Sequence, residues 1–269
     1  MYSEVYSVTL AGLDACIVKV ETDAGDGLPS FEMSGCLAAQ VTEARERVRV
    51  AVKNSGIILR PQKIMVNISP ADIRKAGNGF DLPVAAGILA ADGIIKTDML
   101  ESSVIIGELS LDGSVNAVRG IINCVAKAAQ MGFKRCIVPS CNICEGEHIE
   151  GIEVLGVDSL KQLIGYFNGE SELIDAIDAK KSREHDVIHM KNETCPDFAD
   201  ITGQVTAKRA SLIAAAGHHN ICYMGIPGTG KTMMAKRIST IMLPLNESEK
   251  MELTRIYSAA GKLEGRSII

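Results

Sequence analysis

The feature that most constrains this chain is a glycine-rich run, Gly225-Ile226-Pro227-Gly228-Thr229-Gly230-Lys231-Thr232. It satisfies the pattern G-x-x-x-x-G-K-[ST] at every fixed position. The apolar run 220–224 before it predicts a buried strand, and residues 232–238 after it predict a helix. A strand, a glycine loop and a helix in this order gather backbone N–H groups at a helix N-terminus, where they attract phosphate oxygens.

The residues of this run have separate expected roles in binding ATP and its metal ion. Lys231 is expected to reach the β- and γ-phosphates, and the hydroxyl of Thr232 is expected to ligate Mg²⁺. The other positions predicted to contact the nucleotide surround these two. They are Gly225, Pro227, Gly228, Thr229, Gly230 and Met233.

Composition limits the class of protein. The chain has 269 residues, of which 46% are hydrophobic and 23% charged, so it suits two packed domains. The net charge of −5 shows no overall bias toward nucleic acid, although a local basic patch is compatible with that average. The sequence has no apolar run of about 18 residues and no leader, which predicts a cytoplasmic protein without membrane contact. The eight cysteines are then expected to be reduced.

Residues 1–167 are expected to form an α+β domain, because strands and helices alternate irregularly and hairpins come early. Asp81 is expected to cap a helix. In the helix at 38–54, Glu43 and Arg47 lie four residues apart, and its arginines are expected to lie on a solvated face in preference to a nucleic-acid contact. The apolar stripe of this helix is predicted to consist of Val41, Ala44, Val48 and Ala51. The segment 30–33 is expected to return as a strand from the turn at 24–27, and Asp112-Gly113 is expected to form a tight turn between two strands. Strands are predicted at 5–10, 15–21, 30–33, 63–68, 104–107, 109–111, 135–138 and 152–155, and helices at 38–54, 81–91, 120–131 and 159–167.

Residues 168–196 have the mixed charge of a linker, with one possible short helix at 171–181. A second domain is expected to begin at 197 and to open with a helix that Gly217 ends. Asn246 is expected to cap a further helix that runs from 247 to about 260. The apolar side of the first of these helices is predicted to consist of Val205, Ala207, Leu212, Ile213 and Ala216.

Long motifs in both parts resemble the YifB/ComM family of bacterial magnesium-chelatase-like AAA+ ATPases. In the first part they are Val66-Asn67-Ile68-Ser69-Pro70-Ala71-Asp72, Gly79-Phe80-Asp81-Leu82-Pro83-Val84-Ala85 and Gly107-Glu108-Leu109-Ser110-Leu111-Asp112-Gly113. In the second part they are Asp200-Ile201-x-Gly203-Gln204-x-x-Ala207-Lys208-Arg209-Ala210 and Gly228-Thr229-Gly230-Lys231-Thr232-Met233-x-Ala235-Lys236-Arg237. One departure is Ile226, where the family usually has proline.

The resemblance implies a fold for each part. Residues 1–167 are expected to have the Lon-protease-like fold, also called ribosomal S5 domain 2-like. Residues 197–269 are expected to form the N-terminal part of an α/β P-loop AAA+ domain. On the same basis only, Asp200 and Ile201 are carried over as residues beside the adenine.

The resemblance also implies a function, an ATP-driven ring, expected to be a hexamer, that acts on DNA as a branch-migration motor in natural transformation. One alternative is the ATPase subunit of a magnesium chelatase, disfavoured because dedicated subunits of that kind lack the Lon-like domain. Another is a serine–lysine peptidase, which is disfavoured because Pro83 and Ile122 stand at the positions of its nucleophile and lysine. No catalytic residue is therefore predicted.

Two further expectations concern the hydrolysis of ATP and a group of cysteines. No hydrophobic run ending in Asp-Glu follows Thr232, so the chain is expected to be a fragment that binds ATP without turning it over. Cys136, Cys141, Cys144 and His148 lie near one another in sequence. A metal site is one reading of them, and reduced thiols on and beside a loop are the favoured one.

Overall fold

The computed structural model describes residues 1–176, 197–263 and 268 of the chain. The chain divides into two compact units, Met1–Asp186 with Lys250–Ile269, and Val187–Glu249. Residues from Lys250 onward therefore lie with the first unit, whereas the sequence assigned them to a second domain that begins at 197. Of the helix predicted at 171–181, residues 177–181 lie outside the described residues, and a short strand, Ile174–Asp175, stands in the remainder where a helix was expected.

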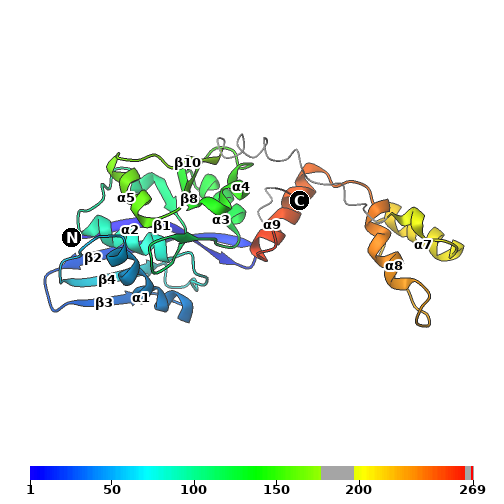
Figure 1. Cartoon of the computed structure of the whole chain (residues 1–269), viewed down its shortest axis with the longest axis horizontal. Helices are drawn as coiled ribbons and strands as arrows, with labels where there is room; N and C mark the ends of the chain where they lie inside the picture. Colours follow the sequence, from blue (N-terminus) through cyan, green and yellow to red (C-terminus); the bar gives the residue numbers. More distant parts are fainter. Residues whose placement is uncertain (177–196, 264–267, 269) are drawn as a thin grey trace. The chain divides into compact units, whose positions relative to one another are not determined.

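An eight-stranded mixed sheet forms the centre of the first unit (Figure 1). Its strands lie in the order β10-β9-β8-β5-β1-β2-β4-β3. They are β1 (Tyr2–Ala11), β2 (Asp14–Gly25), β3 (Ser30–Ser34), β4 (Lys63–Ser69), β5 (Ser103–Ile105), β8 (Arg135–Pro139), β9 (Glu153–Val157) and β10 (Ile174–Asp175). A separate two-stranded hairpin consists of β6 (Glu108–Leu109) and β7 (Val115–Asn116), with the predicted turn at Asp112 and Gly113 between them.

The sheet has an antiparallel part and a parallel part that meet at β1. β1 and β2 form a long hairpin, in which Gly12 has a φ of 68°, a conformation that favours glycine. β4 continues this part antiparallel to β2, while β5, β8 and β9 follow parallel to β1. β3 pairs parallel to β4 at the edge and therefore runs opposite to β2, which confirms the strand expected to return from the turn at 24–27. β4 lies between them and pairs with β2 over its seven residues.

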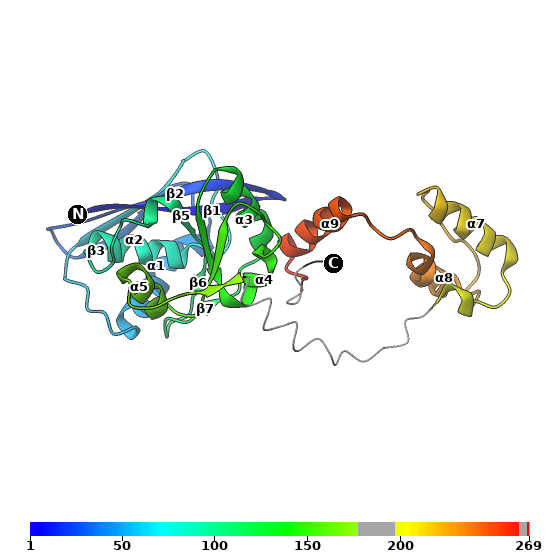
Figure 2. The ribbon, with the colours of Figure 1, turned by 90° about the horizontal axis from the view of Figure 1, so that it is seen from above.

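Helices cover both faces of the sheet. Successive residues of β5 and β8 belong to two different apolar clusters: Ile105 and Ile137 to one, Val104 and Cys136 to the other. Because side chains alternate along a strand, the two clusters lie on opposite faces. Figure 2 shows α1 and α2 together along the antiparallel part, with α3 and α4 at the other end. The helices of this unit are α1 (Ala39–Asn54), α2 (Asp81–Ala91), α3 (Ile121–Gln130), α4 (Ile143–Gly146), α5 (Leu160–Asn168) and α9 (Glu247–Ala259), of which α9 extends from the second unit.

Helix α2 is buried along its whole length and includes one ionisable residue, Asp81. The expectation that Asp81 caps this helix is wrong, because Phe80 holds the N-cap position and the side chain of Asp81 turns elsewhere. Its carboxylate accepts two hydrogen bonds from Arg47 on α1 and one from the backbone N–H of Leu109. Arg47 is accordingly not on a purely solvated face, although Glu43 lies 4.0 Å from it at the exposed surface.

The described part of the second unit has two helices and two short 3₁₀ turns. They are α7 (Val205–Ala216), α8 (Lys231–Arg237), η4 (Phe198–Asp200) and η5 (Ile238–Ile241). A small apolar cluster of Phe198, Ile201 and Met234 joins these elements. The predicted apolar side of α7 is largely wrong, because Val205, Leu212, Ile213 and Ala216 are exposed and only Ala207 is partly buried. Ser211 is buried instead, since its hydroxyl lies 2.6 Å from the hydroxyl of Tyr223.

Helix α9 begins where the sequence predicted. The side-chain oxygen of Asn246 accepts from the backbone N–H of Glu249 at 2.9 Å, which is the expected cap. Further along, the carbonyl of Ser258 accepts from the N–H of Gly120, and the hydroxyl of Ser258 donates to Glu145. Within the described residues, none of the helices has the length and apolar character needed to cross a membrane.

Candidate functional site: the glycine loop before helix α8

The glycine-rich run forms an exposed loop that leads directly into α8. Gly228 and Gly230 have φ values of 83° and 81°, in the left-handed region that a residue with a Cβ enters at a cost. A Cβ added to either glycine would meet no atom within 4 Å, so their role is conformational and the surface around them is open. Gly230 occupies the N-cap position of α8, and Lys231 is its first residue.

The backbone N–H groups of this loop find no acceptor in the described part of the chain. Among the residues that the structure describes, none accepts a hydrogen bond from the N–H of Gly228, Thr229, Gly230, Lys231 or Thr232. Unpartnered N–H groups in a row at a helix start are the donors that bind phosphate oxygens. The donor set of the loop therefore fits a polyphosphate.

The ammonium group of Lys231 folds back over the loop. Its Nζ donates to the carbonyl of Ile226 at 2.6 Å and to the hydroxyl of Thr229 at 3.2 Å. Thr229 itself donates to the same carbonyl of Ile226 at 3.0 Å. The positive charge thus lies over the loop, and no described carboxylate pairs with it.

The other residues of this run that are predicted to contact the nucleotide lie at the surface. Pro227 and Thr232 are exposed, and Met233 keeps 37% of its surface accessible. Gly225 is extended, and only the Thr229 hydroxyl lies near the position of a Cβ there. The hydroxyl of Thr232 is thus open to solvent at the start of α8, where its predicted role as a Mg²⁺ ligand remains a prediction.

Asp200 and Ile201, the residues carried over as adenine contacts, lie in a segment that contacts α8. Asp200 accepts from the backbone N–H of Asp197 at 2.9 Å and lies 3.5 Å from Arg237 on α8. Ile201 is buried at 5% exposure against Met234, so its side chain faces the small core of the unit. Their role toward a base remains a prediction.

One residue that supports the loop was not among the predicted site residues. The side-chain amide of Gln204 donates to the carbonyl of Thr229 at 3.4 Å, and Gln204 has a φ of 52°, which is uncommon for a residue other than glycine. Its contact joins the start of α7 to the middle of the glycine loop. The Gly203-Gln204 pair in the family motif was the signal available in the sequence.

The strand predicted at 220–224 is not formed. These residues have no strand pairing, and residues 197–249, all of them described, contain no strand with which they could pair. A strand depends on the hydrogen bonds of a neighbour, and apolar composition alone does not supply one. The segment is held instead by the Tyr223–Ser211 hydrogen bond to α7.

The positions of a serine–lysine dyad in the first unit hold no reactive group. Pro83 lies buried in the first turn of α2, and Ile122 is fully buried in α3. Ser110 lies beside the β6–β7 hairpin, where its hydroxyl accepts from the side-chain amide of Asn116 at 2.8 Å. Proline and isoleucine side chains have neither a nucleophile nor a base, so these positions cannot perform the peptidase reaction.

The cysteine cluster is divided between the core and the surface. Cys136 is completely buried in the sheet, and burial raises the pKa of its thiol to about 12, so the thiolate form that binds metal is suppressed. Cys144 is buried in α4, while Cys141 is exposed. His148 lies 3.1 Å from the carboxylate of Glu147. The described residues include no set of three histidine, cysteine or acidic side chains grouped closely enough to hold a metal ion.

Two family models match the chain. One is described as Subunit ChlI of Mg-chelatase and covers residues 20–142, and the other is described as Magnesium chelatase, subunit ChlI, and covers residues 197–269. The Competence protein ComM of Haemophilus influenzae is 34% identical over 254 residues, which is 94% of this chain and 49% of that protein. The protein YifB of Escherichia coli is 34% identical over 256 residues, 95% of this chain and 49% of that protein.

The chain belongs to the YifB/ComM family of magnesium-chelatase-like proteins. A further relative is the uncharacterized protein Rv2897c of Mycobacterium tuberculosis. It is 37% identical to this chain over 260 residues, which is 97% of this chain and 50% of that protein. The chain spans about half the length of the curated relatives that it matches. The glycine loop lies inside the second of the two matched segments.

Proposed function

We propose that this chain supplies the ATP-binding part of an AAA+ ATPase of the YifB/ComM family. The observation that carries the proposal is the glycine loop, whose five consecutive N–H groups from Gly228 to Thr232 have no partner among the described residues. These groups, with the ammonium of Lys231, would hold the phosphates, and the hydroxyl of Thr232 would ligate Mg²⁺. The bound metal would supply electrostatic stabilisation of the charged phosphates.

Binding of a fluorescent ATP analogue to the purified chain tests this proposal. Lys231→Ala is expected to weaken binding by at least about tenfold, because it removes the charged donor to the phosphates. Lys236→Ala is the matched control, since Lys236 is exposed on the same helix and lies outside the loop. Equal affinity of the Lys231→Ala and Lys236→Ala variants would contradict the proposal.

For the first unit we propose the Lon-protease-like fold in a form without peptidase activity. The family motifs in this part and the mixed sheet with helices on both faces support the fold assignment. The identities of Pro83 and Ile122 support the absence of proteolysis. A fluorogenic peptide assay is expected to show no cleavage that a serine-directed inhibitor stops, and such cleavage would refute this part of the proposal.

For the whole protein we propose a cytoplasmic ring, a hexamer, that uses ATP to move along DNA. Membership in a family that includes the Competence protein ComM is the support for this role. Hydrolysis of ATP by the full-length protein is expected to increase with branched or forked DNA. ATP hydrolysis that no DNA structure stimulates would count against the DNA motor.

A chelatase subunit is the second candidate, because both matching family models are named after the magnesium-chelatase subunit ChlI. The match over residues 20–142 also weakens the expectation that chelatase relatives lack the first part of this chain. Insertion of Mg²⁺ into a porphyrin, measured by absorbance with the partner subunits of a chelatase present, distinguishes this candidate from the DNA motor.

A further inference from the structure

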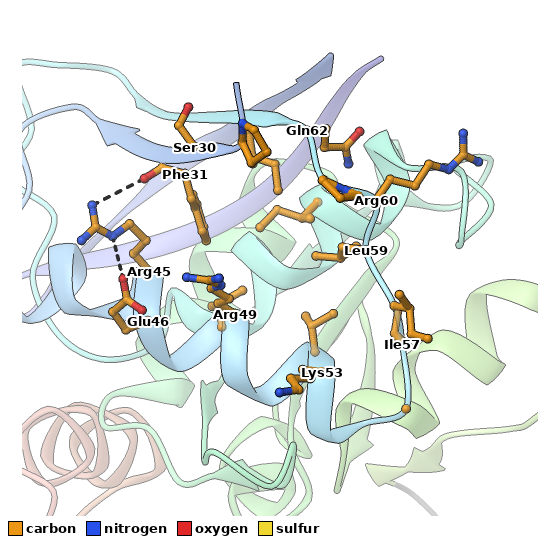
Figure 3. A pocket seen from close by; sticks show the side chains of 18 residues that line it. Ser30, Phe31, Arg45, Glu46, Arg49, Lys53, Ile57, Leu59, Arg60 and Gln62 are labelled. Atoms are coloured by element: carbon orange, nitrogen blue, oxygen red, sulfur yellow. Dashed lines mark hydrogen bonds and ion pairs between the residues drawn. The ribbon is translucent and has the colours of Figure 1, made fainter. Parts of the chain in front are cut away.

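A cavity of about 820 Å³ lies in the first unit between α1, the start of β3 and the segment 56–62 (Figure 3). Its volume is within the range of roughly 300–1,000 Å³ that is typical of small-ligand sites. Apolar side chains from three elements form its inner surface, among them Val52 of α1, Ile64 of β4 and Ile88 of α2. The cavity is separate from the glycine loop, which belongs to the other compact unit.

The rim of this cavity is strongly basic. Its lining includes four cationic side chains, Arg45, Arg49, Lys53 and Arg60, and a single carboxylate, that of Glu46. Glu46 is paired with Arg45 at 3.3 Å. Within the part of the chain that the structure describes, Arg49, Lys53 and Arg60 form no ion pair. Although the net charge of the chain is −5, three cations without a described ion-pair partner thus lie at the rim of one apolar cavity.

The cations on α1 are arranged in a row. Arg45, Arg49 and Lys53 are successive positions four residues apart, so they lie on one side of the helix with a rise of about 6 Å between them. Figure 3 shows these three side chains along the same side of α1. The helix buries Val48 and Val52 beside them, which fixes this row at the edge of the cavity. Such a row suits a ligand that carries several negative charges in sequence.

The opposite wall contributes an aromatic ring. Phe31 of β3 is half-buried, and Figure 3 shows its side chain between β3 and α1. The guanidinium of Arg45 reaches the carbonyl of Phe31 at 3.5 Å, so one end of the cationic row contacts the strand that carries the ring. Base rings stack on aromatic side chains with little dependence on sequence, and their phosphates bind arginine and lysine.

We infer that this cavity binds a nucleotide unit, with the base against Phe31 and the apolar floor and the phosphate on Arg49 and Lys53. The nucleotide is either free or part of a single strand of nucleic acid. A purely apolar ligand leaves the cationic row without a partner, and a free inorganic anion leaves the apolar floor uncovered. A nucleotide satisfies both.

Binding of a fluorescein-labelled oligothymidylate tests this inference. The full chain with Lys231→Ala serves as the parent, so that the glycine loop does not contribute. The Arg49→Gln/Lys53→Gln variant is expected to weaken binding by about tenfold and to reduce the slope of log affinity against log salt by about 0.7, the value for the one phosphate that both residues contact. Arg74→Gln/Lys161→Gln is the matched control, since both residues are exposed cations of the same unit outside the cavity.

A second variant and a second probe complete the experiment. Phe31→Leu is expected to weaken binding by about tenfold through the loss of stacking, and its melting temperature is measured alongside. Thymidine monophosphate is then added at millimolar concentration as a competitor. If it displaces the labelled strand from the parent but not from Arg49→Gln/Lys53→Gln, the ligand is a free nucleotide. A strand that binds without such displacement identifies single-stranded nucleic acid.

Equal affinity of Arg49→Gln/Lys53→Gln and the control double variant, or no binding of either probe to the parent, would overturn the inference. The inference does not rest on the proposed ATP site. Failure of that site appears as ATP affinity that does not depend on Lys231, whereas failure of the cavity appears as oligothymidylate affinity that does not depend on Arg49 and Lys53.

Discussion

Arg47 and Asp81 form a bidentate ion pair between α1 and α2, with Nε 2.8 Å from Oδ2 and Nη2 2.9 Å from Oδ1. Asp81 is completely buried, and its Oδ2 also accepts from the backbone N–H of Leu109 at 3.2 Å. One carboxylate therefore connects α1, α2 and the β6–β7 hairpin. The guanidinium of Arg47 is the only cation in the described residues that pairs with it.

Arg47→Ala is expected to destabilise the first unit by about 3 kcal/mol, because it leaves the buried carboxylate of Asp81 without its cation. This value is at the low end for a broken buried pair, since 25% of the Arg47 side chain is exposed. Urea unfolding followed by circular dichroism measures the change. Glu43→Ala, which removes a 71% exposed carboxylate 4.0 Å from Arg47, is the control and is expected to change stability by less than about 0.5 kcal/mol.

The loss caused by Arg47→Ala is expected to become smaller as the pH falls from 7 toward 4. Burial raises the pKa of Asp81, and Arg47 opposes that effect, so removing Arg47 raises the pKa further. A folded-state pKa above the unfolded value of about 3.9 means that the folded form gains stability relative to the unfolded form as the carboxylate takes up its proton. Unfolding measured at several pH values tests this.

The control for the pH dependence is the Arg47→Ala/Asp81→Asn variant, in which residue 81 no longer titrates. Its difference from Asp81→Asn alone is expected to stay constant over the same range of pH. A destabilisation by Arg47→Ala that does not change between pH 7 and pH 4 would show that Asp81 is not the group whose charge matters.

Asn123→Ala is expected to weaken the attachment of helix α9 to helix α3. The side chain of Asn123 accepts from Nε of Arg255 at 2.6 Å and donates to the carbonyl of Arg255 at 3.1 Å. Loss of two such bonds, each worth about 1 kcal/mol, predicts faster amide hydrogen exchange in α9 by about tenfold or more. Asn54→Ala, whose amide bonds to the carbonyl of Leu111 elsewhere, is expected to leave exchange in α9 unchanged.

The thiols are expected to react in two groups. Cys36, Cys141 and Cys222 are exposed, so they are expected to react first with an alkylating reagent. Burial raises the pKa of Cys136 to about 12 and also raises that of Cys124, so both are expected to react only after unfolding. Peptide mapping after timed alkylation gives the order. Labelling of Cys136 as fast as Cys36 would contradict the buried position of the β8 strand.

Local sequence signals predicted most of the secondary structure of the first unit. The stripe of Val41, Ala44, Val48 and Ala51 gave helix α1 to within one residue at its start, because those side chains recur at the helical period. The cap at Asn246 and the turn at Asp112 and Gly113 were equally local and are confirmed. The glycine loop was identified in the same way, since its pattern is continuous in the sequence.

Other features depended on contacts between distant residues. The basic cavity required α1, β3 and the segment 56–62 to meet, whereas the sequence alone indicated a solvated face for the arginines of α1. The parallel pairing of β3 with β4 and the missing strand at 220–224 likewise depended on which neighbours were available.

By itself, the sequence determined the family, the glycine-rich motif before α8 and the identities of residues 83 and 122, because each depends on the identity of residues at fixed spacings. The tertiary structure alone decided that Asp81 forms an ion pair with Arg47 and that Asn123 forms hydrogen bonds with Arg255 of α9. It also decided that the ammonium group of Lys231 donates hydrogen bonds within its own loop, and that cations without a described ion-pair partner lie around an apolar cavity. These are contacts between residues far apart in the chain or between a side chain and a folded backbone, and no local pattern encodes them.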